Sequence, residues 1–253
     1  MKLFLILALV LTTAIPVLAL NYDQNVTPDV IFGSGNANGS FTTGVAGGIE
    51  LGLRAKLRFN ASNLPENTFN SNGDGSYSFI AGAAPSGFGW LPGSPTTPVW
   101  NFEFTVNTDM SGTSGLVLAD QTYELGLDFD PSPAGTNYLV FDPITPSVPT
   151  PMYDHSLGNN MTTDATDVIA GDPVAYASAL GTLNVAQNSW NYEFFNDAPF
   201  DSFDPADNAV YEIFLRAYDG SGAMVAETAI SIVIGNAVAN EEASWSEVKS
   251  LFR

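Results

Sequence analysis

The sequence has no cysteine and few basic residues, and both facts limit what the protein can be. Without cysteine the fold has no disulfide bond and no residue to carry a lipid, so packing or metal ions must hold it together. Only 7 lysines and arginines stand against 27 acidic residues, which gives a net charge of −20. A field of that sign repels phosphate backbones and anionic membrane surfaces, so we expect no nucleic-acid partner.

Long hydrophobic runs are also scarce, and the clearest one opens the chain. Lys2 supplies a positive start, residues 3–11 are apolar, and small residues around Ala19 suit a cleavage site. The apolar run is too short to span a bilayer comfortably. We therefore expect a signal peptide over residues 1–19, no membrane span in the mature chain, and a secreted, extracellular or cell-surface protein.

Histidine occurs once, which argues against a hydrolytic triad. His155 lies between Asp154 and Ser156. In an extended segment those two neighbours point away from the histidine, because side chains alternate between faces. No Gly-x-Ser-x-Gly motif surrounds any serine. The sequence predicts a protein that is not an enzyme.

The most regular feature is a strand pattern that occurs twice. The sequence WNFEF at residues 100–104 returns as WNYEF at residues 190–194, and each copy precedes a second strand-like run, at 123–129 and 211–217. Alternation places Trp100, Phe102 and Phe104 on one face, and the second copy repeats the arrangement. We interpret these aromatic faces as the interior between two packed sheets.

Two further alternating segments support an all-β fold. Residues 49–59 alternate Ile, Leu, Ala and Phe with Glu, Gly, Arg and Lys, and residues 211–219 and 223–234 form a hairpin. The basic stripe of Arg54, Lys56 and Arg58 has two interpretations: an acidic ligand, or pairing with an acidic neighbouring strand such as the one carrying Glu103. Cross-strand pairing is the favoured interpretation.

Helix signals are confined to two places. Asp172 followed by Pro173 predicts a helix start, and residues 174–185 are the main helix candidate. In the tail, Ser244 and Glu247 form a capping box ahead of an apolar stripe, so a short amphipathic helix that docks, stays loose or binds a partner is expected. The prediction is one antiparallel β-sandwich over residues 20–236, of jelly-roll or immunoglobulin-like type, with a short inserted helix and a linker and helix over 237–253.

A calcium site is suggested by oxygen-bearing residues at alternate positions. Asn70, Asn72 and Asp74 precede Gly75 in the spacing of the first half of a calcium loop. The second half departs from the pattern, because Ala81 stands where a bidentate glutamate is needed. A tight Gly-Asp-Gly turn is the alternative.

A second calcium hypothesis comes from aspartates beside prolines. Phe-Asp-Pro occurs three times, and the candidate ligands are Asp128, Asp130, Asp142 and Asp204. If these turns converged at one end of the sheets, the carboxylates could coordinate Ca²⁺. The alternative is a set of similar turns that cap strands.

A ligand site is suggested by two aromatics on a Pro/Gly/Ser-rich loop at residues 84–98. Phe88 and Trp90 could stack on a sugar ring, or fold back on the edge of the core. Polysaccharide is therefore one partner class, and other surface proteins are another.

The body of the chain resembles a class of bacterial secreted proteins. The segments WNFEF (100–104), YELG (123–126), FDPI (141–144), NVAQNSW (184–190) and FDSFDP (200–205) look like those of uncharacterised PEP-CTERM proteins, which an exosortase sorts to the cell surface. The resemblance covers most of residues 49–235 and implies an exported surface or matrix component. The C-terminal end of the chain differs from that class, because residues 245–253 stand where the class has a Pro-Glu-Pro signal, a transmembrane helix and a basic terminus.

These observations favour an exported, non-catalytic structural or adhesive protein of the surface or matrix, with calcium as a candidate stabiliser. Two alternatives remain open. One is a carbohydrate-binding module that uses Phe88 and Trp90, and the other is a glycan hydrolase that uses paired carboxylates of the aspartate-rich loops.

Overall fold

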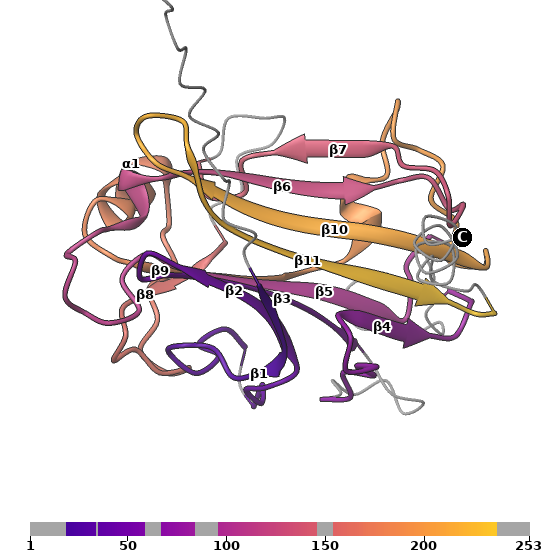
Figure 1. Cartoon of the computed structure of the whole chain (residues 1–253), viewed down its shortest axis with the longest axis horizontal. Coiled ribbons are helices and arrows are strands. Elements are labelled where there is room, and N and C mark those ends of the chain that lie inside the picture. The colour runs from indigo at the N-terminus through magenta and orange to yellow at the C-terminus, as the bar shows by residue number, and fades with distance from the viewer. Residues whose placement is uncertain (1–18, 34, 59–66, 84–95, 146–153, 237–253) are drawn as a thin grey trace, which may run out of the picture.

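The structure is a computed structural model that describes residues 19–33, 35–58, 67–83, 96–145 and 154–236. It is built mostly of strands, in two sheets that form two layers (Figure 1). The first sheet has the order β1-β2-β3-β5-β9-β8, and its neighbouring strands are all antiparallel. Its strands are β1 (Leu20–Gln24), β2 (Phe41–Ala46), β3 (Ile49–Leu57), β5 (Trp100–Asn107), β9 (Val185–Trp190) and β8 (Ser156–Gly158).

The second sheet corrects the prediction of a purely antiparallel fold. Its order is β4-β11-β10-β6-β7, and β4 runs parallel to β11, so this sheet is mixed. The other pairs of this sheet are antiparallel. For β10 and β11 the reason is local, because the short turn at 219–223 joins them. The strands are β4 (Ser76–Phe79), β6 (Thr122–Asp128), β7 (Tyr138–Phe141), β10 (Ala209–Tyr218) and β11 (Met224–Ile234).

One hydrophobic core fills the space between the layers. The predicted aromatic face of β5 points into it: Trp100 is 1% exposed, and Phe102 and Phe104 are completely buried. Trp190 is 2% exposed and packs against Phe104 with ring centroids 4.9 Å apart. The prediction that these tryptophans are interior residues is confirmed.

The second Trp-Asn copy does not continue as a strand. β9 ends at Trp190, and residues Tyr192–Phe195 form a 3₁₀ helix, η2. The side chain of Asn191 accepts a hydrogen bond from the backbone N–H of Glu193, which caps this helix. As a result Phe194 is 42% exposed, whereas its counterpart Phe104 is buried. The prediction of a shared face for Trp190, Tyr192 and Phe194 is wrong.

The segment between β1 and β2 covers the outer face of the first sheet. The backbone N–H of Ile31 donates to the Gln187 side chain of β9 over 2.8 Å, and Val26, Val30, Phe32 and Phe41 form a second small apolar cluster. Because this segment lies over the sheet, residues on both faces of β3 and β5 are buried. Alternation alone predicts that one face of these strands would meet solvent.

The helix and the last hairpin follow the sequence signals closely. Helix α1 is Pro173–Leu180, and the Asp172 carboxylate accepts from the backbone N–H groups of Val174 and Ala175, as an N-cap should. The helix is shorter than predicted because Gly181 caps it and the chain then enters β9. In β11, alternate residues from Ala226 to Ile234 are buried, as predicted. Residues 1–18 and 237–253, with the expected signal peptide and tail helix, lie outside the described residues.

Candidate functional site

The proposed calcium loop is a tight turn in which the side chains bond to neighbouring residues. The Asn70 amide donates to the Ser78 carbonyl, and the Asn72 amide donates to the Ser76 and Ser78 hydroxyls. Asp74 accepts from the backbone N–H and the hydroxyl of Ser76, at 2.9 and 2.7 Å. These contacts are those of a turn that leads into β4, which was the alternative interpretation.

The four candidate aspartates do not converge on one point. Asp142 lies beside Tyr123 near the start of β6, where its carboxylate accepts from the Ile144 and Thr145 N–H groups. Asp128 lies at the other end of the same strand, where it accepts from the Asp130 and Asn137 N–H groups. About five residue steps of strand, roughly 17 Å, therefore separate the two regions.

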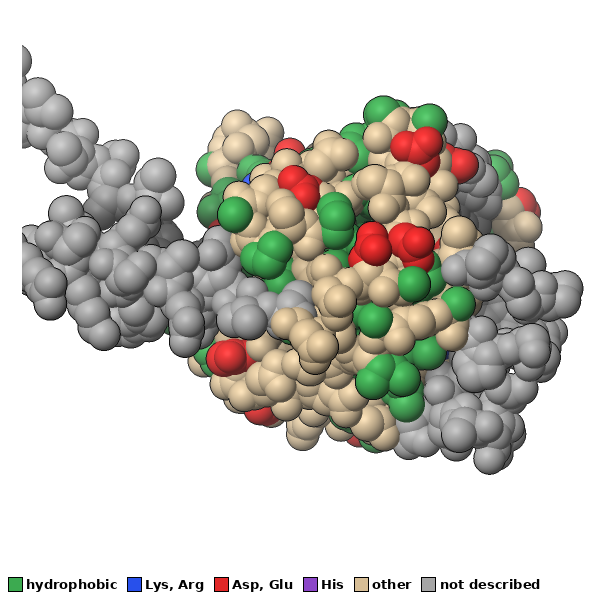
Figure 2. All heavy atoms as spheres, turned by 90° about the vertical axis from the view of Figure 1, so that its right-hand side faces the viewer, with side chains coloured by type: hydrophobic (Ala, Val, Ile, Leu, Met, Phe, Trp, Pro, Cys, Tyr) green, Lys and Arg blue, Asp and Glu red, His purple; other side chains and the backbone are tan. Residues whose placement is uncertain are grey.

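The remaining two aspartates also fix turns. Asp130 accepts from the Ser132 N–H, and Asp204 accepts from the Ala206 N–H. Figure 2 shows the end of the molecule where β6 and β11 finish, and the acidic side chains there lie in small separate groups among hydrophobic ones. Within the described ranges, no three histidine, aspartate or glutamate side chains form a group that could hold a metal ion.

The basic stripe of β3 pairs with β5, as the favoured interpretation predicted. Arg54 is the register partner of Glu103, and its Nε donates to Glu103 Oε2 over 2.6 Å. Lys56 Nζ lies 3.1 Å from the other oxygen of the same carboxylate. Burial lowers the pKa values of Arg54 and Lys56, and the Glu103 carboxylate opposes that shift. The segment at 36–39 covers these groups, so Arg54 and Lys56 are not available to an acidic ligand.

The single histidine belongs to the core. His155 is completely buried, and its ring lies within 5.8 Å of the rings of Phe104, Tyr176 and Trp190. Its Nδ1 is 3.9 Å from the Asp154 carboxylate, which is a long separation for a hydrogen bond. The neighbouring Ser156 is buried in β8 and pairs with β9. His155 therefore contributes to the packing of the core.

Phe88 and Trp90 lie outside the described residues, so their interpretation as ligand residues stays a prediction. A different surface of aromatic and acidic side chains is described in full. It is the outer face of the second sheet, formed where β11, β10, β6 and β7 lie side by side. We define this outer face by Glu124, Tyr138, Glu212, Arg216, Tyr218 and Glu227.

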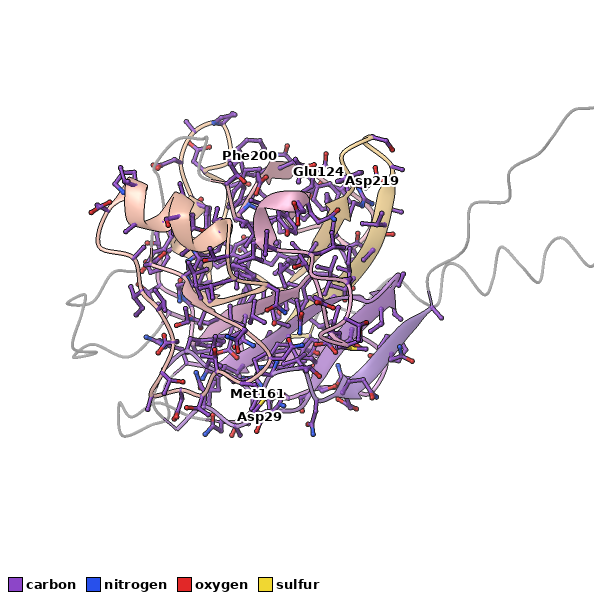
Figure 3. All side chains as sticks on the ribbon, turned by 90° about the vertical axis from the view of Figure 1, so that its left-hand side faces the viewer. Asp29, Glu124, Met161, Phe200 and Asp219 are labelled. Carbon is purple, nitrogen blue, oxygen red and sulfur yellow. The ribbon has the colours of Figure 1, made fainter. Side chains whose placement is uncertain are left out.

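The register of the second sheet places these residues on one side. In β10 the residues Ile213, Leu215 and Ala217 are buried in the core, so the alternate residues Glu212, Arg216 and Tyr218 point outward. Arg216 pairs with Glu227 on β11 and with Glu124 on β6, which makes a row of alternating charge across three strands. Figure 3 labels Glu124 on the upper layer, away from Asp29 and Met161 at the opposite side of the molecule.

Each polar side chain of the outer face is held by another. The Tyr138 hydroxyl donates to Glu212 Oε2 and the Tyr218 hydroxyl donates to Glu124 Oε2, both over 2.6 Å. Arg216 Nε donates to Glu227 Oε1 over 2.7 Å. These pairs fix the positions of the charged groups and of both tyrosine rings before any ligand arrives.

Phe214 forms the floor of the outer face. Its ring lies over Gly126 of the neighbouring strand, so closely that a Cβ at Gly126 would be 2.1 Å from a ring carbon. The Tyr138 ring packs against it at 5.1 Å, and the Arg216 guanidinium lies 4.1 Å from its centroid. Glycine is needed at 126 because any side chain would displace this ring. Sequence reasoning predicted a strand over 211–217 but missed its outward set, although Glu212, Phe214, Arg216 and Tyr218 recur at period two.

Comparison of the chain with family models, curated proteins and solved structures gives no match. No helix among the described residues is long and apolar enough to cross a membrane.

Proposed function

We propose that this protein is an exported, non-catalytic structural or adhesive component of a cell surface or extracellular matrix. The observation that carries the proposal is how the side chains are used. The conspicuous aromatics Trp100 and Trp190 fill the core, and the candidate aspartates accept backbone hydrogen bonds at turns. Such residues build a scaffold, whereas a catalytic centre needs polar groups aimed at a reacting atom.

The setting of the proposal comes from the sequence. The signal-like segment at 1–19, the excess of acidic residues and the absence of cysteine suit a secreted protein that stays soluble by charge. The resemblance to exosortase-sorted proteins points the same way. For the architecture, we propose that the two layers form a β-sandwich related to the jelly-roll or immunoglobulin-like types, with the helical tail of residues 237–253 appended.

Whether calcium stabilises the scaffold is a separate question from the proposed function. We assign the loop of Asn70, Asn72 and Asp74 and the aspartate turns a structural role, because their side chains hold turn backbones. A calcium ion at either place would add stability to the scaffold without changing the function proposed. Melting the protein with calcium and then with a chelator separates the two cases.

Export is the part of the proposal that can be tested directly. The full chain is expressed in a bacterial host, and the medium, envelope and cytoplasm are separated. We expect the protein in the medium or envelope with a new N-terminus near Leu20, as read by mass spectrometry. Replacing residues 5–8 by charged residues should retain it in the cytoplasm. A full-length cytoplasmic protein with Met1 intact would overturn the proposal.

A further inference from the structure

We propose that the outer face of the second sheet binds a cationic amino-sugar polysaccharide. This inference rests on the proposed function, because it names the partner that a surface or matrix protein would hold. The binding groups are the tyrosine rings of Tyr138 and Tyr218 and the carboxylates of Glu124, Glu212 and Glu227.

The first argument is charge. The outer face carries those three carboxylates against the one guanidinium of Arg216, and the whole chain has a net charge of −20. An anionic polysaccharide is repelled by such a surface, and a cationic one is attracted to it. Charge complementarity therefore selects a polymer that bears ammonium groups.

The second argument is the balance of hydrogen-bond donors and acceptors. Both tyrosine hydroxyls already donate to glutamates, and the Nε–H of Arg216 donates to Glu227, so the tyrosine donors of the outer face are in use. A carboxylate offers about four lone-pair sites, so each glutamate keeps capacity to accept. The three carboxylates together therefore offer more acceptor sites than the single guanidinium offers donors. Sugar hydroxyls and ammonium groups are donors, and bonds from an ammonium to a carboxylate are the stronger, charge-assisted kind.

The third argument is shape. From β11 to β7 the outer face spans three strand spacings, roughly 14 Å, and from Glu212 to Tyr218 it extends roughly 20 Å along β10. An area of this size accommodates several sugar rings of an extended polymer. Tyr138 and Tyr218 supply rings against which the C–H faces of sugars pack, and whose faces also attract ammonium groups.

Pre-organisation favours binding at this surface. The side chains of Tyr138, Tyr218 and Arg216 are positioned by their glutamate partners, and Tyr138 and Arg216 also pack on Phe214. Ordering flexible side chains is a main cost of association, so a surface with these groups already fixed loses less on binding. A basic peptide has the positive charge of an amino-sugar polymer but not its repeating sugar rings. Binding of such a peptide is therefore the competing outcome in the test.

The test is isothermal titration calorimetry of the purified full chain with soluble, fully deacetylated glucosamine oligosaccharides at a pH where the amines are protonated. We expect Tyr138→Ala and Tyr218→Ala each to weaken binding about tenfold, and Glu212→Gln, which keeps the side-chain shape, to weaken it about threefold. Melting curves establish that each variant is folded.

Matched controls are taken from residues that are not part of the outer face. Tyr22→Ala removes an exposed tyrosine of β1, and Asp164→Asn removes one exposed charge, and neither should change the affinity. The N-acetylated oligosaccharide should bind less tightly, and alginate should not bind. Four results would each overturn the inference. They are no binding of the amino-sugar oligosaccharide, equal losses of affinity in the control variants, equally tight binding of alginate, and equally tight binding of oligolysine. Export is measured separately by fractionation, so failure here leaves that result standing.

Discussion

Arg54 and Glu103 form an ion pair of 2.6 Å in which both side chains are completely shielded from solvent. The Arg54 guanidinium is also enclosed by Phe41 and Phe69, each with its ring centroid 4.2 Å away, and its Nη1 donates to the carbonyls of Ala37 and Gly39. One arginine thus ties the first sheet to the segment that covers it. Lys56 shares the same carboxylate, so Glu103 is the common partner of two buried cations.

Replacing Glu103 by glutamine should therefore be severely destabilising. The variant leaves Arg54 and Lys56 buried without a counter-charge, and breaking such a pair costs about 3–5 kcal/mol of unfolding free energy. Urea denaturation measures the change. Glu227→Gln is the matched control, because it breaks a 2.7 Å pair with Arg216 whose side chains are 34% and 30% exposed, and it should cost about 0–1 kcal/mol. Equal losses in the two variants would show that burial does not decide the strength of this pair.

Gly44 should tolerate no side chain. A Cβ at this position would lie 1.8 Å from the carbonyl oxygen of Glu227, where β11 crosses close to β2. Because the contact is with backbone, Gly44→Ala forces a strand to move, and we expect a loss of about 1–3 kcal/mol by thermal melting. At Gly171 an added Cβ meets nothing within 4 Å, so Gly171→Ala serves as the control. A Gly44→Ala protein that melts like the parent would contradict this packing.

Glu50 should make stability fall as the pH rises. Burial raises the pKa of Glu50 to about 7 from an ordinary value of 4.5, although a hydrogen bond from the Thr27 N–H opposes the shift. The folded state therefore holds this proton more tightly than the unfolded state. The stabilising effect is fully present below pH 4.5 and is lost as the pH rises through about 7.

Glu50→Gln should flatten this dependence, because glutamine stays neutral and can still accept from Thr27. Relative to the variant, the parent should lose about 3 kcal/mol of unfolding free energy between pH 4.5 and 8. Denaturation at a series of pH values measures the difference. Glu212→Gln, at an exposed position of β10, is the control. If the unfolding free energies of the parent and Glu50→Gln changed with pH in parallel, the raised pKa of Glu50 would be refuted.

Calcium should leave the melting temperature unchanged. The side chains of Asn70, Asn72 and Asp74 bond within their own turn, and the described residues bring no three acidic or histidine side chains into a metal-binding group. Because an ion that binds only the folded state raises its stability, melting with calcium and then with a chelator measures the effect. A rise in the midpoint that Asp74→Asn abolishes would contradict this prediction and support a calcium site at the loop.

The parts of the fold that sequence reasoning predicted are those governed by local rules. Alternation identified the core faces of β5 and β11, and the pairing of Asp172 with Pro173 located the start of α1. Alternation does not detect the cap at Asn191, so it extends the second Trp-Asn copy as a strand past its end. The outer face was missed because a row such as Glu227, Arg216 and Glu124 combines three strands, and only their register brings it together.

By itself, the sequence determined the β-rich character of the chain, its acidic charge and which side of each ribbon is apolar, because residue type and period-two spacing act over a few neighbouring positions. Only the tertiary structure decided that β4 joins β11 in parallel, that the segment after β1 closes over Arg54, and that Asp142 lies far from Asp128. Those outcomes depend on strand pairing and on contacts that reach beyond the few neighbouring positions over which a local pattern acts.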